Sequence, residues 1–315
     1  MSIKFQKDKI QLLELFSSIH YFGAMRDKWE ETIKHAESCL EIYMTRLPLN
    51  YRAKPVPDQP DIAWGNRVLP NFRHTLEKLN QGYIMLTHGD ISALGYANSV
   101  RNDFKGQLDY VADWMSSVDR QTYEDNIYAA VTMAHNISVT MEAEWQSFGL
   151  LWHCDELKRI PTSFLANNYK INSSIFVRSG DKTIVDGIYV PDVEDACPQF
   201  LHSRFNRSPL ASVCVGINDL IDADTGETYD QEHIYKEVEC TWYLIEKRNN
   251  DQRPDTNTNQ VRQLLRVVAG QLCPQTGFYF TPAVQHSRKL FNEGEIMPSS
   301  DSTYGQTIWQ WDEVQ

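Results

Sequence analysis

The sequence predicts an α+β fold: a helical N-terminal domain over residues 1–160, then an α+β domain over 161–315 with a mainly antiparallel β-sheet. Three observations predict it. Apolar residues recur at three- or four-residue steps through the first half. Short β-prone runs separated by turn residues follow Pro161. Apolar residues make up 42% of the 315 positions, enough to fill a substantial core.

The predicted helices begin with Ile10, Leu13, Phe16 and Ile19, whose spacing lines one helical face. A second apolar stripe over 29–43 ends before the prolines of 55–60. These prolines predict a loop, because proline lacks an amide donor and biases the residue before it away from helical geometry. Further helices are expected over residues 72–86, 91–117, 121–136 and 138–153.

The predicted strands begin with Ser174–Val177 and Ile184–Val190, which the turn residues Ser179-Gly180-Asp181 would join as a hairpin. Glu239–Ile245 predicts either a strand or the end of a helix. The polar segment Asn249–Asn259 predicts a mobile surface loop. Further strands are expected over residues 213–217, 264–272 and 278–281.

The composition indicates a cytoplasmic protein. The first thirty residues show no secretion signal, and no apolar run is long enough to span a bilayer. No Cys-x-x-Cys pair or disulfide-like spacing occurs, so we expect reduced, mostly buried cysteines, no metal site and no cofactor. Six positions carry cysteine: Cys39, Cys154, Cys197, Cys214, Cys240 and Cys273.

The charge distribution favours a basic protein partner. The net charge is −12, which argues against binding nucleic acid, because such binding draws on clustered lysine and arginine. Acidity is concentrated in 186–246, where thirteen acids accompany Arg204, Arg207 and Lys236. We expect neither a nucleic acid nor a membrane as partner.

Three local motifs resemble chemical sites but favour structural interpretations. The adjacent side chains of 153–156 point in different directions on a helix, so they indicate a helix end. Gly89 and Asp90 suit a helix stop followed by an N-cap. The segment Asp222–Glu227 has part of a calcium-loop rhythm, but its glycine comes one position early and the closing glutamate is missing, so an acidic turn is expected.

The segment from Cys273 to Gln315 carries a family resemblance. It contains Gly277-Phe278-Tyr279-Phe280-Thr281-Pro282-Ala283 and Thr307-Ile308-Trp309-Gln310-Trp311-Asp312, and glycines and prolines shape the backbone between them. This block resembles the C-terminal signature of bacterial immunity proteins of the Imm71/Imm72 families, which accompany toxins delivered by type VI secretion. Strand alternation would place Thr307, Trp309 and Trp311 on one face, so the block is expected to close the C-terminal sheet.

The resemblance implies an immunity protein, not an enzyme, that binds and occludes a cognate effector toxin in bacterial competition. The acidic segment adds the expectation of a nuclease toxin, because such a toxin presents a basic cleft to phosphates. An enzyme that reverses toxin damage and an adaptor of the secretion machinery are the alternatives. The residues expected to bind the toxin are acids and tyrosines of this segment: Asp219, Asp222, Asp224, Glu227, Tyr229, Asp230, Glu232 and Tyr235.

Overall fold

The structure is a computed structural model that describes residues 6–159, 168–248, 266–281, 284, 287–299 and 307–312. It confirms the predicted fold class, with helices in the N-terminal half followed by antiparallel sheets. The residues form two compact units, 1–251 and 252–315. The expected domain boundary at 160–161 falls where the structure changes from helices to strands. That residues 1–160 and 161–315 are separate domains stays a prediction. The predicted surface loop 249–259 lies outside the described residues.

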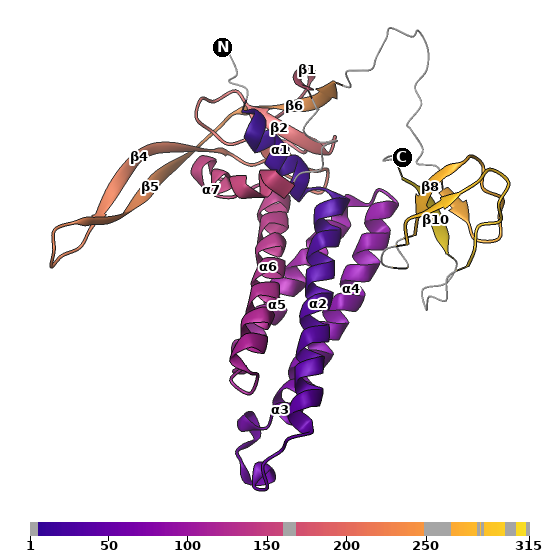
Figure 1. Cartoon of the computed structure of the whole chain (residues 1–315). Helices are drawn as coiled ribbons and strands as arrows, with labels where there is room; N and C mark the ends of the chain where they lie inside the picture. The colour runs from indigo at the N-terminus through magenta and orange to yellow at the C-terminus, as the bar shows by residue number, and fades with distance from the viewer. Residues whose placement is uncertain are drawn as a thin grey trace. The chain divides into compact units, whose positions relative to one another are not determined.

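Long helices lying side by side form the first part of unit 1 (Figure 1). The hydroxyl of Ser18 accepts the Tyr21 amide at 3.1 Å and begins α2, while Ser116 accepts the Asp119 amide at 3.2 Å and begins α6. Trp29 packs against Phe72 at 4.4 Å between ring centroids and donates its indole N–H to the Phe72 carbonyl at 3.0 Å. The main helices are α1 (Lys7–Phe16), α2 (Ile19–Met44), α4 (Leu69–Thr87), α5 (Ala97–Gln107), α6 (Ser117–Glu142) and α7 (Ser147–Leu151).

The helix boundaries differ from the predicted ones at several places. The predicted break between the helices 121–136 and 138–153 is wrong, and the second one divides into the end of α6 and the separate helix α7. Helix α6 continues through the predicted break because no glycine or proline interrupts the chain there. That helix ends at Ala143, which has the left-handed φ of 56°. The predicted loop at the prolines of 55–60 contains the short helix η2 (Val56–Asp58) and the start of α3 (Pro60–Ala63). The short helix η1 (Tyr51–Ala53) precedes it, and the π-helical turn η3 (Trp64–Val68) follows α3. The predicted helix 91–117 becomes the 3₁₀ segment η4 (Ile91–Tyr96) and α5.

The first sheet has the strand order β1-β6-β2-β3. Its strands are β1 (Asn168–Arg178), β2 (Gly187–Pro191), β3 (Gln199–Leu201) and β6 (Thr241–Arg248). The predicted hairpin between Ser174–Val177 and Ile184–Val190 is therefore wrong: β6 pairs antiparallel with both β1 and β2 and lies between them. Trp242 on β6 is fully buried and forms part of an apolar core with Tyr189 and Leu201, as expected of an inner strand.

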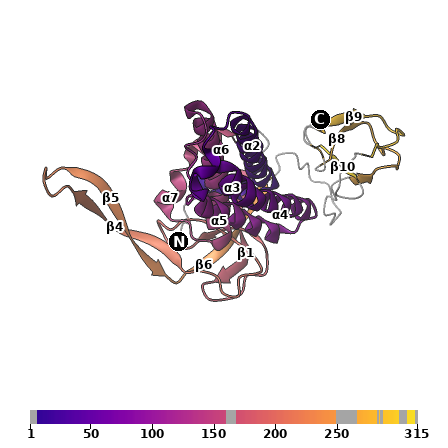
Figure 2. The same ribbon diagram turned by 90° about the horizontal axis from the view of Figure 1, so that it is seen from below.

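The hairpin of β4 (Ala211–Ile221) and β5 (Thr228–Val238) forms a separate two-stranded sheet in unit 1. It extends away from the helices of the same unit, as both views show (Figures 1 and 2). Each strand has 11 residues, which corresponds to about 36 Å of extended chain. The sequence predicted only the first part of β4, because β5 shows no alternation of apolar and polar residues.

Unit 2 contains a four-stranded sheet of order β7-β10-β8-β9. Its strands are β7 (Arg266–Val268), β8 (Gly277–Phe280), β9 (Lys289–Phe291) and β10 (Ile308–Trp311). The C-terminal strand β10 pairs with both β7 and β8, so it is an inner strand of this sheet. Trp309 contacts Phe291 and Trp311 contacts Tyr279, with ring centroids 4.8 and 5.2 Å apart. The residues that carry the family resemblance therefore build the core of unit 2.

Candidate protein interface

All eight residues predicted to bind a partner lie on the β4–β5 hairpin or its connecting turn. The hairpin, residues 211–238, carries seven acidic residues and one basic residue, Lys236, which gives it a net charge of −6. No ion pair among the described residues involves a carboxylate of the hairpin. This charge is therefore presented to solvent over the outer part of the hairpin.

The turn is ordered by the side chain of Asp222. Its Oδ1 accepts the amide of Asp224 at 2.9 Å and the amide of Thr225 at 2.8 Å, and Gly226 adopts φ 71°. Hydrogen bonds from Thr225 and Asp224 hold the pKa of the Asp222 carboxyl below its usual range. The predicted acidic turn is confirmed, and its position places Asp222, Asp224 and Glu227 at the tip of the hairpin.

The strand register distributes the remaining predicted residues over two faces, because directly paired residues lie on the same face of an antiparallel ribbon. One face contains the pairs Asp219–Gln231, Ile217–His233 and Cys214–Tyr235. The opposite face contains the pairs Leu220–Asp230, Asn218–Glu232 and Gly216–Ile234. A flat partner surface would thus contact the tip and one face, not all eight residues.

The base of the hairpin packs on the rest of unit 1. The His233 ring lies 4.2 Å from the Phe148 ring of α7, and Tyr235 is hydrogen-bonded to the backbone of Phe148. Burial is the main cause that raises the pKa of Tyr235. Tyr235 is thus half-buried against α7, whereas Tyr229 near the tip is 69% exposed. Of the two tyrosines, Tyr229 is the accessible anchor.

Several apolar side chains on the hairpin are exposed as well. Ile217 is 50% exposed and Ile221 is 60% exposed, although β-branched side chains of this size are usually buried. Val215 and Ile234 are exposed too. A protruding ribbon with both charged and apolar exposed side chains has the chemistry of a protein interface, since apolar groups supply contact area and charges supply selectivity.

The other motifs that the sequence singled out have structural roles. Gly89 has φ 82° and the Asp90 carboxylate accepts the Ser92 amide at 3.0 Å, so the predicted stop and cap are confirmed. His153 packs its ring on Phe16 and Trp145, and Cys154 begins the 3₁₀ segment η5 (Cys154–Arg159), as expected of a helix end. All six cysteines are free, and four of them are buried.

Two shallow hollows lie beside the loop that follows α5, with volumes of about 210 and 230 Å³. Both are smaller than the roughly 300–1,000 Å³ typical of small-molecule sites. Asp103 lines the first hollow; burial raises the pKa of its carboxyl, and its Oδ2 has no hydrogen-bond partner among the described residues. Neither hollow offers a binding surface as large as that of the hairpin.

One chemical cluster was not predicted from the sequence; it is formed by His35, Cys39 and Asp119. The four-residue spacing of His35 and Cys39 within a predicted helix was the available signal, because residues i and i+4 lie on the same helical face. Nothing in the sequence near Asp119 indicated that this residue would join the cluster, because it lies on a helix far along the chain from His35 and Cys39.

None of the described helices is long and apolar enough to cross a membrane. Comparisons with protein-family models, with curated proteins and with solved structures find no match to the chain. The resemblance of Cys273–Gln315 to the Imm71/Imm72 immunity proteins therefore stays a prediction.

Proposed function

We propose that this protein is an immunity protein that binds and occludes a toxin through the acidic β4–β5 hairpin. The observation that carries the proposal is the hairpin itself: a protruding ribbon with a net charge of −6, exposed isoleucines and an exposed tyrosine. The resemblance of the C-terminal block adds the class of partner, an effector of type VI secretion. The acidity of the hairpin indicates that the partner's binding surface is basic.

Occlusion follows from shape and charge together. A nuclease must present a basic cleft to phosphates, and a narrow acidic ribbon complements such a cleft. The carboxylates at the tip, Asp222, Asp224 and Glu227, accelerate encounter by electrostatic attraction, which raises association rates by roughly 10- to 1,000-fold at low salt. Tyr229 and Ile221 then supply apolar contact area that becomes buried on binding. The ribbon would thus occupy the site that the toxin's substrate needs.

The test uses the toxin encoded beside this chain's gene, since toxin and immunity genes of this class are expected to lie together. The variant Asp222→Lys/Asp224→Lys/Glu227→Lys reverses the charge of the tip. Its control is Glu41→Lys/Asp58→Lys/Glu142→Lys, which changes the net charge equally at exposed acids of the helical part. Asp222→Asn/Asp224→Asn/Glu227→Gln removes the tip charge without reversing it.

We expect the tip reversal to lower the association rate with the toxin by at least about tenfold, and the control to change it little. We also expect the loss to shrink as salt is raised, because screening weakens attraction between exposed charges. Cells that express the toxin should lose protection with the tip reversal and keep it with the control. Equal binding and equal salt dependence of the two variants would contradict the proposal.

A further inference from the structure

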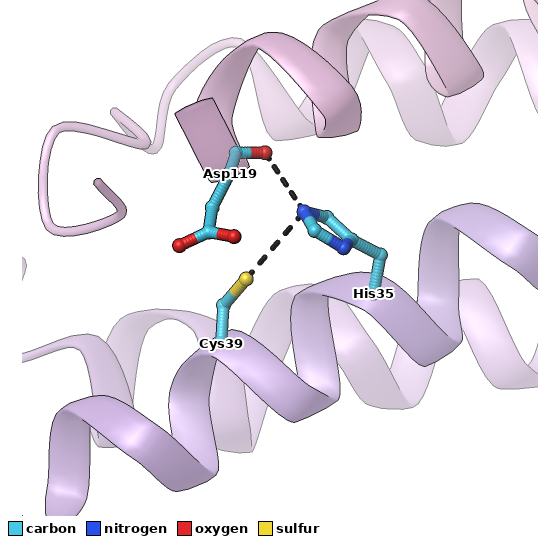
Figure 3. Close-up of side chains that lie close together, drawn as sticks. All are labelled: His35, Cys39 and Asp119. Carbon is cyan, nitrogen blue, oxygen red and sulfur yellow. Dashed lines mark hydrogen bonds between the residues drawn. The ribbon is translucent and has the colours of Figure 1, made fainter. Parts of the chain in front are cut away.

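Three metal-ligating side chains converge between the helices α2 and α6. His35 and Cys39 lie on one face of α2, and Asp119 lies in the first turn of α6, which packs beside α2 (Figure 3). The ligand atoms of the three side chains all lie within 4.8 Å of one another. Cys39 is buried, whereas His35 and Asp119 are half-buried, so the cluster is reachable from solvent.

The spacing of the histidine and cysteine suits a bound metal ion. The His35 Nε2 lies 3.5 Å from the Cys39 Sγ. In a tetrahedral zinc site with Zn–N of about 2.05 Å and Zn–S of about 2.3 Å, those two atoms are separated by about 3.6 Å. The separation of these two atoms therefore fits one shared ion.

The present hydrogen bonds show what must change before a metal binds. The His35 Nε2 lies 2.8 Å from the Asp119 carbonyl and donates to it in one tautomer, so metal binding requires the other tautomer and a shift of the ring away from this oxygen. The Asp119 Oδ2 accepts the Ser116 hydroxyl at 2.6 Å, which orients the carboxylate and leaves its Oδ1 without a described partner.

We propose that His35, Cys39 and Asp119 bind one zinc ion that links α2 to α6. Thiolate, imidazole and carboxylate are all established zinc ligands, and three protein ligands leave a fourth position for water. Binding displaces the thiol proton, so zinc, the thiolate and the carboxylate together have no net charge. The site cross-links the two 26-residue helices of unit 1. The proposal revises the expectation of no metal site and is independent of the proposed function.

The experiment adds Zn²⁺ or Co²⁺ to the metal-free full-length chain and to four variants. Cys39→Ser, His35→Gln and Asp119→Asn each alter one ligand, and the amide oxygen introduced by Asp119→Asn can still accept the Ser116 hydroxyl. Cys154→Ser is the matched control, because Cys154 is a free, exposed cysteine outside the cluster. Circular dichroism without metal shows whether each variant folds.

We expect the wild type and the Cys154→Ser variant to hold one zinc per chain, and each cluster variant to bind at least about tenfold more weakly. The cobalt form should show thiolate-to-cobalt charge-transfer absorption that Cys39→Ser lacks. Zinc should also raise the midpoint of urea denaturation of the wild type, a readout that requires no variant. No stoichiometric zinc in the wild type, or equal binding by Cys39→Ser, would overturn the proposal.

Discussion

Replacement of Trp242 tests how the first sheet holds the base of the hairpin. Trp242 is fully buried in the core that contains Ala211, the first residue of β4, and its Nε1 donates to the Pro209 carbonyl at 2.9 Å. The Ser179 hydroxyl donates to the same carbonyl at 2.9 Å. The Pro209 carbonyl, just before β4, therefore accepts from two donors, one on β6 and one in the turn after β1.

The magnitudes follow from these contacts. Trp242→Ala leaves a cavity and should lower the free energy of unfolding by about 3–5 kcal/mol. Trp242→Phe retains most of the ring packing and leaves Ser179 as donor, so we expect a loss of about 1–2 kcal/mol. Ser179→Ala leaves Trp242 as donor to the Pro209 carbonyl. The double variant Ser179→Ala/Trp242→Phe removes both donors, and should lose about 1 kcal/mol more than the sum of its single variants.

The assay is urea denaturation followed by far-ultraviolet circular dichroism, since tryptophan fluorescence changes with the substitution itself. Hydrogen exchange of the β4 amides adds a local measurement, and we expect faster exchange in the double variant. Additivity within about 0.3 kcal/mol would refute the shared-acceptor reasoning. Equal losses for Trp242→Phe and Trp242→Ala would refute the cavity reasoning.

Two further predictions concern backbone geometry. Ala143→Gly should stabilise the chain by up to about 1 kcal/mol, because Ala143 ends α6 with φ 56°, a conformation that disfavours residues with a Cβ; Ala129→Gly within the same helix should instead destabilise it by about 1 kcal/mol in urea denaturation. Asp222→Asn should keep the tip turn and Asp222→Ala should loosen it. Because hydrogen bonds lower the folded pKa of Asp222, its contribution to stability is present above the unfolded pKa of about 3.9 and is lost as the pH falls through the folded value. A carboxyl resonance that titrates at or above about 3.9 would contradict this pH dependence.

The two proposals concern different parts of unit 1 and predict different responses. Loss of zinc should lower the stability of the helices, because the ion stabilises only the folded chain. Charge reversal at the hairpin tip should lower partner binding, and Asp222→Lys also removes the acceptor that orders the turn. The neutral variant Asp222→Asn/Asp224→Asn/Glu227→Gln keeps an acceptor at position 222, so we expect it to fold like the wild type. A tip variant that unfolds would therefore point to a fault in the turn and not in the interface.

The sequence by itself determined the fold class, the positions of most helices and the location of the acidic segment. The three-residue spacing of Ile10, Leu13 and Phe16 predicts a helix from residues that are neighbours along it. Gly89 and Asp90 predict a helix end and a cap in the same local way. The acidity of 186–246 was likewise readable as composition. Local chemistry suffices where the interacting groups lie within a few residues of each other.

Only the tertiary structure decided which distant segments meet. β6 pairs with both β1 and β2 and buries Trp242 in the core of unit 1, and no pattern within 174–190 could reveal that pairing. The outer part of β5, residues 228–232, is exposed on both faces, so it lacks the alternation that marks a half-buried strand. The joining of His35 and Cys39 to Asp119 depends on the packing of α6 against α2. Such contacts depend on how apolar faces from distant parts of the chain pack together. The spacing of residues within one segment does not predict that packing.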